Sequence, residues 1–228
     1  MTNLLAIETS TEACSVALYA DGETREIFKL APMQHAELLL PAVQSLLDGA
    51  GLSLASLDAI AFGRGPGSFT SLRIGIGVVQ GLAWGAELPV VPISSLAAVA
   101  QQVSSAALAE SASICVAMDA RMQEVYTANF ELGKDGLVKP SSAEQVCSPG
   151  LVSTPAAGPF IAVGNGFDCF EELQAMAVKA VSCHTDIWPR AETICKMAIQ
   201  WLESNEPLPA GHAQPVYVRN NVASKPAS

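Results

Sequence analysis

A glycine-rich turn between two regular segments constrains the fold of this chain more than any other feature. The apolar run AIAF at residues 59–62 leads into alternating glycines at Gly63, Gly65 and Gly67, followed by Ser68 and a long segment without proline. Glycine permits positive φ angles and close approach of other backbone atoms, and serine is a common helix N-cap. The pattern therefore predicts a strand, a tight turn and a helix over residues 68–85.

Two interpretations of this turn are open. A helix N-terminus presents free N–H groups that favour an anion, so the turn can be a phosphate-binding loop. The spacing fits neither common version, because no lysine precedes the serine as in a P-loop and Ser68 stands where a dinucleotide fingerprint starting at Gly63 requires glycine. The other interpretation is a purely structural turn, since glycine-rich turns are frequent between a strand and a helix.

The predicted helix carries a stripe of glycines. Gly77, Gly81 and Gly85 are four residues apart, so they lie near one face of the helix. Each glycine costs roughly 1 kcal/mol relative to alanine, and close approach of another backbone would offset that cost. The approaching backbone belongs either to the chain's own sheet or to another subunit. A membrane partner is not expected, because no stretch of the chain is long and apolar enough to span a bilayer.

Composition narrows the class of protein. The 228 residues suffice for one large domain or two small ones, and 50% are hydrophobic and 15% charged, as in a globular protein with a large core. The net charge of −10 disfavours unaided binding to the phosphate backbone of a nucleic acid. The six cysteines form no C-x-x-C pair, and no basic leader precedes the first apolar run. We therefore expect reduced, mostly buried thiols in a cytoplasmic protein without a signal peptide.

The rest of the chain alternates strand-like and helix-like segments in a specific order. An Asp21-Gly22 pair marks a hairpin, and apolar spacing marks an amphipathic helix over residues 33–49. The first series is three strands, a helix, a strand, a helix, a strand and a helix, predicted at residues 3–9, 14–19, 23–29, 33–49, 59–62, 68–85, 90–92 and 95–108. The series restarts with strands at residues 114–118, 124–131 and 160–163, followed by a helix at 191–203 and an extended tail at 214–221.

Two landmarks indicate an internal duplication. Glu8 and Asp119 each end the first strand of a series, and FIAVGNG at residues 160–166 resembles IAFGRG at 60–65. The second series has only a serine- and proline-rich stretch where the first has the helix at 33–49. We therefore predict an α/β protein with the duplicated actin-like (ribonuclease H-like) fold of sugar kinases, Hsp70 and actin. Its N-terminal lobe would cover residues 1–108, and a reduced C-terminal lobe with an extended tail would cover residues 109–228.

Four motifs resemble one family. They are LAIETS at residues 5–10, GPGSFTSLRIG at 65–75, MDAR with EVY at 118–126, and PVYVR at 215–219. Together they cover most of the chain, and the second is the most specific. The chain is thereby identified as resembling the TsaB family, also called YeaZ.

This resemblance implies a role in making N6-threonylcarbamoyladenosine beside the anticodon of tRNA. TsaB is the non-catalytic relative of the catalytic subunit TsaD, so the expected partners are a TsaD-like subunit and a TsaE-like ATPase, with tRNA bound only through the complex. The family also implies a homodimer when the protein is alone. One helical surface would serve both contacts, and its predicted residues are His35, Leu39, Ser68, Arg73, Gly77, Gly81 and Gly85.

The resemblance also bears on metal and cofactor binding. The catalytic relative holds a metal with a His-x-x-x-His pair on its first helix, whereas here His35 is followed by Leu39 at the position of the second ligand. One histidine does not make a metal site. We therefore expect no bound metal, no cofactor and no catalytic residue in this chain.

Nucleotide binding has two interpretations. Glu8, Thr9, Ser10 and Asp119 resemble the hairpins that face the nucleotide phosphates in the actin-like fold, so they are candidate nucleotide-binding residues. Alternatively, Thr9 and Ser10 satisfy the backbone of their own turn. The competing functions are an actin-like ATPase or a glycoprotease-like (M22) peptidase. Neither a G-x-S-x-G elbow nor an H-E-x-x-H pair supports the peptidase.

Overall fold

The computed structural model describes residues 2–219 apart from residues 111 and 157. Its first sheet has five strands in the order β3-β2-β1-β4-β5. β1, β4 and β5 run parallel, and β2 and β3 continue the sheet as antiparallel neighbours. The bounds of these strands are Leu4–Glu8, Ala13–Ala20, Glu23–Leu30, Ala59–Gly63 and Val90–Ile93.

The second sheet repeats this arrangement. Its order is β11-β10-β6-β7-β8, with β9 paired to the edge of β7. The three parallel strands β6, β10 and β11 match β1, β4 and β5 of the first sheet. The antiparallel strands β7 and β8 match β2 and β3. The bounds of β6 to β11 are Ser113–Asp119, Val125–Leu132, Val138–Pro140, Gln145–Cys147, Phe160–Val163 and Ser182–His184. The predicted α/β class and the duplicated actin-like fold are confirmed by this repeated strand order.

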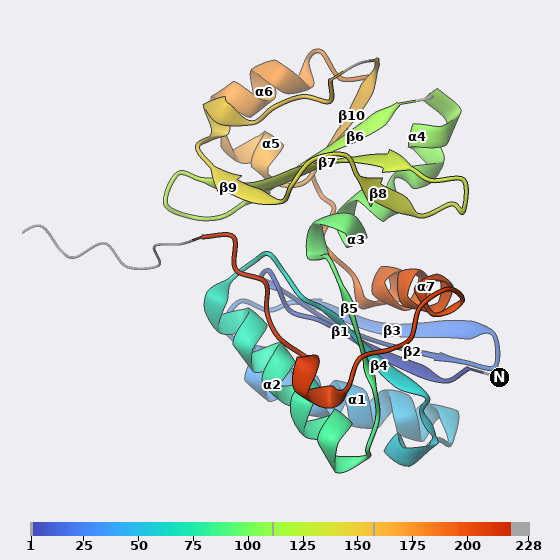
Figure 1. Cartoon of the computed structure of the whole chain (residues 1–228). Helices are drawn as coiled ribbons and strands as arrows, with labels where there is room; N and C mark the ends of the chain where they lie inside the picture. Colours follow the sequence, from blue (N-terminus) through green and yellow to red (C-terminus); the bar gives the residue numbers. More distant parts are fainter. Residues whose placement is uncertain (1, 111, 157, 220–228) are drawn as a thin grey trace, which may run out of the picture.

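Helices cover both faces of the first sheet (Figure 1). α1 (His35–Ala50) and α2 (Phe69–Gly85) pack against each other on one face, and α7 (Ala191–Leu202) covers the other. Side chains of β1 alternate accordingly, because Leu5 and Ile7 join the core under α1 and α2 whereas Leu4 and Ala6 join the core with α7. We call this sheet with its three helices the first lobe.

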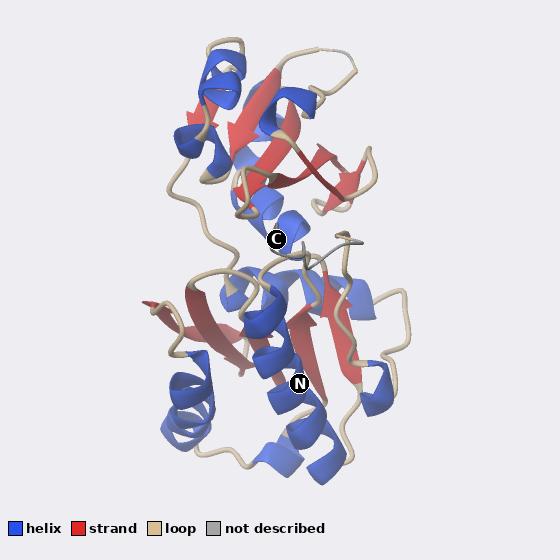
Figure 2. Cartoon of the chain, turned by 90° about the vertical axis from the view of Figure 1, so that its left-hand side faces the viewer, coloured by secondary structure: helices blue, strands red, loops and turns tan. Residues whose placement is uncertain are grey.

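The second sheet and the helices on its outer face form the second lobe (Figure 2). The helices there are short, α5 (Gly166–Cys169) and α6 (Glu171–Ala177). Where the first lobe has α1 between its third and fourth strands, the described residues of the second lobe have only β9 and the 3-10 turn Pro149–Leu151. The predicted reduction of the second lobe is thus confirmed. α5, α6, β8, β9 and β11 were not predicted.

Two predicted helices begin or end differently in the structure. α1 begins at His35 rather than at residue 33, because Met33 has a positive φ of 62°. The helix predicted at 95–108 is two helices, α3 (Ser95–Gln102) and α4 (Ser104–Glu110), interrupted at Val103. Ser94 caps α3, since its side chain accepts a hydrogen bond from the Ala97 N–H. Ser68 precedes α2, but its side chain makes no capping hydrogen bond.

The C-terminal part of the chain returns to the first lobe. α7 contacts all five strands of the first sheet, and Leu208 pairs with Val90 at the edge of that sheet. Residues 191–213 therefore pack with the first lobe, although they lie in the range 109–228 predicted for the second. A division of the chain near residue 108 stays a prediction.

Two further predictions concern membrane-spanning helices and cysteines. No helix among residues 2–219, as far as they are described, is long and apolar enough to cross a membrane. All six cysteines are free, and Cys14, Cys115 and Cys195 are buried. Cys169 and Cys183 are exposed, so the prediction of mostly buried thiols holds for only half of them.

Candidate functional site

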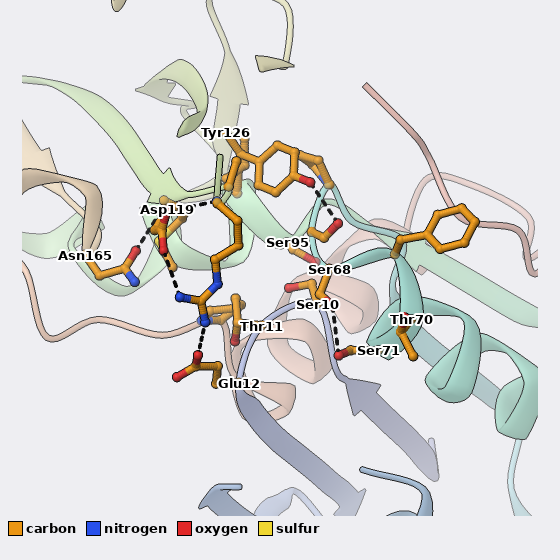
Figure 3. Close-up of a pocket in the computed structure, with 18 of the residues that line it drawn as sticks. Ser10, Thr11, Glu12, Ser68, Thr70, Ser71, Ser95, Asp119, Tyr126 and Asn165 are labelled. Atoms are coloured by element: carbon orange, nitrogen blue, oxygen red, sulfur yellow. Dashed lines mark hydrogen bonds and ion pairs between the residues drawn. The ribbon is translucent and has the colours of Figure 1, made fainter. Parts of the chain in front are cut away.

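A cavity of about 550 Å³ lies between the two lobes (Figure 3). The first lobe lines it with the hairpin after β1, at residues 10–12, and with the glycine-rich turn at 66–71. The second lobe contributes the β6–β7 hairpin at 118–122, Tyr126, Asn165 and Cys169. The remaining lining residues come from α3, from residues 188–189 and 216–219, and from the start of α1, where His35 lies. This volume is in the range of small-molecule sites.

The glycine-rich turn is packed directly onto the β1–β2 hairpin. A Cβ atom on Gly63 would lie 1.9 Å from a carboxylate oxygen of Glu8, and one on Gly67 would lie 2.2 Å from the carbonyl oxygen of Ser10. On α2, a Cβ on Gly75 would lie 2.1 Å from Thr9 Oγ1. No side chain fits at these distances, so the structural interpretation of the turn explains these glycines without a phosphate.

Glu8 is an internal group rather than a cavity group. Its side chain is fully buried and does not line the cavity. Its carboxylate accepts hydrogen bonds from the Ser10 backbone N–H and, at 2.7 Å, from Ser95 Oγ at the start of α3. Burial raises the pKa of the Glu8 carboxyl above its usual range, although these hydrogen bonds lower it. Glu8 therefore ties the end of β1 to α3.

The other nucleotide-binding candidates divide in the same way. The Thr9 hydroxyl donates to the Ser71 carbonyl oxygen at 2.9 Å and does not reach the cavity, whereas Ser10 and Asp119 both line it. The registers of the two sheets show which of these residues are equivalent in the two lobes. Ile7 pairs with Phe62 before Gly63, and Val116 pairs with Val163 before the corresponding Gly164.

Counting from these pairs, Asp119 is equivalent to Ser10, and Ala117 is equivalent to Glu8. The predicted equivalence of Glu8 and Asp119 is therefore wrong by two residues. The motif comparison missed this because it matched the acidic residues that end the two strands, whereas β6 extends two residues further than β1.

Arg121 joins the two hairpins across the cavity through its ion pairs with Glu12 and Asp119, both of which Figure 3 labels. Its guanidinium forms ion pairs with Glu12 of the first lobe and, at 3.4 Å, with Asp119 of its own hairpin. The Asp119 carboxylate also accepts a hydrogen bond from the Arg121 N–H at 2.9 Å. Arg121, Met122 and Gln123 have φ values of 61°, 55° and 61°, so three consecutive non-glycine residues lie in the left-handed region. The ion pair with Asp119 accompanies this tight turn.

Two more contacts cross between the lobes. Arg64, in the glycine-rich turn, forms a bidentate pair with Glu144 of the second lobe at 2.9 and 3.1 Å. The Tyr126 hydroxyl donates to the Gly67 carbonyl oxygen at 3.0 Å. Glu12, Glu144 and Tyr126 were not predicted as site residues, because nothing in the sequence relates positions so far apart.

The charges of the cavity are already matched within the protein. Both arginines that line the cavity are paired, Arg121 with Glu12 and Asp119 and Arg219 with Glu124. Among the described residues, no unpaired lysine or arginine lines the cavity to receive a phosphate. The arrangement suits holding the lobes together better than holding a polyanion. A nucleotide role for Ser10 and Asp119 stays a prediction.

Five of the seven residues predicted for the partner surface are exposed. They are Ser68, Arg73, Gly77, Gly81 and Gly85. A Cβ atom added to any of the last three would have no neighbouring atom within 4 Å, so the glycine stripe does not pack against the chain's own sheet. Exposed Trp84 on α2 and Leu40 on α1 lie on the outer faces of the same two helices, with 72% and 51% of each residue accessible.

His35 and Leu39 belong to the opposite, inner face of α1. They are 1% and 0% exposed, and His35 Nε2 lies 3.2 Å from the Ala13 carbonyl oxygen. Their predicted contact with a partner is therefore corrected, because that face of the helix packs on β2. No group of three or more metal-ligating side chains occurs in the described part of the chain.

Fold and site together define a class: a duplicated actin-like protein whose interlobe cavity is bridged by its own ion pairs. The family model for TsaD, described as tRNA N6-adenosine threonylcarbamoyltransferase, matches residues 29–227. The protein named tRNA threonylcarbamoyladenosine biosynthesis protein TsaB of Escherichia coli is 40% identical over 97% of this chain and 96% of its own. The TsaB of Haemophilus influenzae is 38% identical over 97% and 95%.

A solved structure agrees with these sequences. YeaZ from Pseudomonas aeruginosa is 41% identical and superimposes with a TM-score of 0.86 over 95% of this chain and 100% of its own. The chain belongs to the TsaB (YeaZ) family.

Proposed function

We propose that this chain is a non-catalytic subunit in the threonylcarbamoyladenosine modification of tRNA, which acts by binding and activating a TsaD-like catalytic subunit. Membership of the TsaB family supports a role in this biosynthesis. The finer role as a binding and activating subunit rests on the surface and the cavity described above.

One observation carries the proposal: the exposed glycine stripe of α2. Gly77, Gly81 and Gly85 weaken the helix, yet a Cβ atom on any of them would meet no atom of the chain within 4 Å. Exposed Trp84 and Leu40 add apolar area to the same pair of helices. Glycines allow a second helix to approach closely, and an exposed tryptophan is the kind of residue that dominates an interface. The partner is therefore a helical surface, either TsaD-like or a second copy of this chain.

The remaining features favour a supporting role over catalysis. His35 is buried against a backbone carbonyl and has Leu39 where a second metal ligand would stand. The arginines of the cavity are paired with carboxylates. A subunit of this kind acts by binding one conformation of its partner more tightly than another.

The other components follow from this role. We propose that a TsaE-like ATPase joins the pair, that the chain forms a homodimer when alone, and that tRNA is reached only through the complex in the cytoplasm. The net charge of −10 supports the indirect contact with tRNA.

Reconstitution with the partner subunits, ATP, threonine, bicarbonate and tRNA tests the proposal. Gly81→Leu should reduce both binding of the TsaD-like subunit and tRNA modification by more than about tenfold, because it separates two helices in close contact. Gly150→Leu is the matched control, since Gly150 is exposed in the second lobe and a Cβ there is 4.0 Å from its nearest neighbour.

Two outcomes would contradict the proposal. One is full modification in the absence of this chain. The other is an unchanged affinity of Gly81→Leu for the TsaD-like subunit, measured by calorimetry. Turnover of ATP or of a peptide by the purified chain alone would instead support the ATPase or peptidase alternatives.

A further inference from the structure

The C-terminal residues 213–219 form a connection between the lobes that is independent of the chain's two covalent crossings. They run along α2 and end between the two sheets (Figure 1). We call them the strap. Because residues 191–213 pack with the first lobe, the strap starts on one lobe and reaches the other.

Residues 213–217, the first part of the strap, are anchored on the first lobe. Gln80 Nε2 donates to the Ala213 carbonyl oxygen at 2.7 Å, and the Val216 N–H donates to the Arg64 carbonyl oxygen at 2.8 Å. The Tyr217 ring lies 5.2 Å from the Phe69 ring at the start of α2. This end of the strap therefore has backbone and aromatic contacts with the turn that lines the cavity.

Arg73 strengthens the aromatic contact. Its Nε donates to the Tyr217 hydroxyl at 2.9 Å, and its guanidinium lies 3.8 Å from the centre of the Phe69 ring. The face of an aromatic ring carries partial negative charge, so the guanidinium above it is attracted electrostatically. Arg73 thus holds both rings together.

The upper end of the strap is held by one side chain. Arg219 donates to Glu124 Oε2 at 2.5 Å and to the Ala120 carbonyl oxygen at 3.1 Å, both in the β6–β7 hairpin of the second lobe. Its side chain is 16% exposed. Within the described residues, Arg219 makes all of the hydrogen bonds from the strap to the second lobe.

The strap also borders the cavity. Residues 216–219 line it together with the glycine-rich turn and the β6–β7 hairpin, whereas α3 and residues 188–189 line it where the chain crosses covalently between the lobes. Figure 2 views the molecule from the side on which the strap lies in Figure 1. The covalent crossings thus lie on one side, and the strap closes another.

We propose that the strap is a releasable latch that holds the two lobes closed over the cavity. Its hold on the second lobe depends on one arginine rather than on a backbone ladder, so it opens more readily than the sheets unfold. Release frees the β6–β7 hairpin from the strap, which leaves the Tyr126–Gly67 hydrogen bond and the Arg121–Glu12 ion pair as the remaining polar contacts of that hairpin with the first lobe among the described residues, so the hydroxyl-lined cavity opens to solvent more often. The proposal does not depend on any partner subunit.

Hydrogen exchange of the full chain, followed by mass spectrometry, tests the latch. Arg219→Gln should accelerate exchange by about tenfold in the peptides covering residues 66–72 and 119–126, which face each other across the cavity. Exchange in β1 and β6 should not change. Tyr217→Ala, which removes the contact with Phe69 and the hydrogen bond from Arg73 at the other end of the strap, should give the same pattern.

Arg25→Gln is the control for lost charge. Arg25 is exposed on the outer strand β3 and donates to the Gly49 carbonyl oxygen at 3.0 Å, away from the cavity. It should leave exchange in both cavity peptides unchanged. The proposal is overturned if neither strap variant accelerates exchange in these two peptides. It is equally overturned if exchange in β1 and β6 accelerates as much, because the strap is then part of the folding core.

Discussion

The two lobes have the same strand order but keep different helices. α1 and α2 have 16 and 17 residues in the first lobe. In the second lobe, α5 takes the place of α2 with four residues, and the described chain has no α-helix in the place of α1. The sheets and hairpins therefore suffice for the duplicated fold, whereas the long helices serve something that only the first lobe does.

The glycines of the two lobes are of two kinds, those in close contact with a neighbouring strand and those exposed on a helix. Gly63 and Gly164 follow equivalent strands, and a Cβ on Gly164 would lie 2.3 Å from the Ala117 carbonyl oxygen. This close contact of a turn with the neighbouring strand is common to both lobes. The exposed stripe of Gly77, Gly81 and Gly85 has no counterpart on the four-residue α5. Glycines of the first kind belong to the fold, and those of the second kind fit a partner surface.

The largest expected effect is on the contact glycines. Gly67→Ala and Gly164→Ala should each lower the free energy of unfolding by about 2–4 kcal/mol, because the new methyl group meets a backbone carbonyl that cannot move away. Gly164 also has a φ of 112°, which strains alanine. Urea denaturation measures both. A loss of stability below about 0.5 kcal/mol at either site would contradict the claim that the close contact of the turn requires glycine in both lobes.

The next effect concerns Glu8, which has alanine as its counterpart in the second lobe. Its pKa is raised in the folded protein, so the folded state binds the proton more tightly than the unfolded state. Stability from this group is therefore present at low pH and is lost as the pH rises above the usual value of 4.5.

Glu8→Gln keeps the shape and removes this titration. The variant should gain stability relative to the unmodified chain as the pH rises from 4 to 8, measured by urea denaturation at each pH. A difference between Glu8→Gln and the parent chain that is constant with pH would contradict a raised pKa.

The ion pair between Arg64 and Glu144, which joins the lobes, should contribute less to the free energy of unfolding than the groups above. A double-mutant cycle with Arg64→Gln and Glu144→Gln should give a coupling of about 1–2 kcal/mol, because the pair is bidentate and its side chains are only 26% and 13% exposed. The exposed pair Lys196–Glu192 on α7 should give about 0.3–0.5 kcal/mol. Equal couplings would show that the interlobe pair contributes no more than a surface pair.

The sequence predicted the fold well because local patterns determine it. Apolar strands, the Asp21-Gly22 hairpin and the glycine-rich turn each have a short-range physical cause, and their order was enough to indicate the duplication. The short second-lobe elements α5, α6 and β11 were missed, since segments of three to seven residues carry too little periodicity.

The site was harder to predict because its contacts are long-range. Arg121 meets Glu12, and Arg64 meets Glu144, only after the lobes assemble. Motif position also failed to show that Glu8 is buried while Ser10 lines the cavity, because β1 ends at Glu8 and the bend that follows, rather than strand alternation, sets the direction of Ser10. Likewise, His35 and Leu39 were assigned to the correct helix but to its exposed side.

The smallest expected effect tests the exposed stripe itself. Gly81→Ala should raise the free energy of unfolding by about 0.5–1 kcal/mol, because alanine has the higher helix propensity and the added methyl group meets nothing within the chain. Gly75→Ala, in the same helix, should instead destabilise, since its Cβ would lie 2.1 Å from Thr9 Oγ1. Both are measured by urea denaturation at several protein concentrations, because self-association adds to apparent stability. If Gly81→Ala destabilises the chain at every concentration, the stripe is held against the chain's own atoms. If it stabilises the isolated chain but weakens association, glycine is retained there for the partner at the expense of the helix.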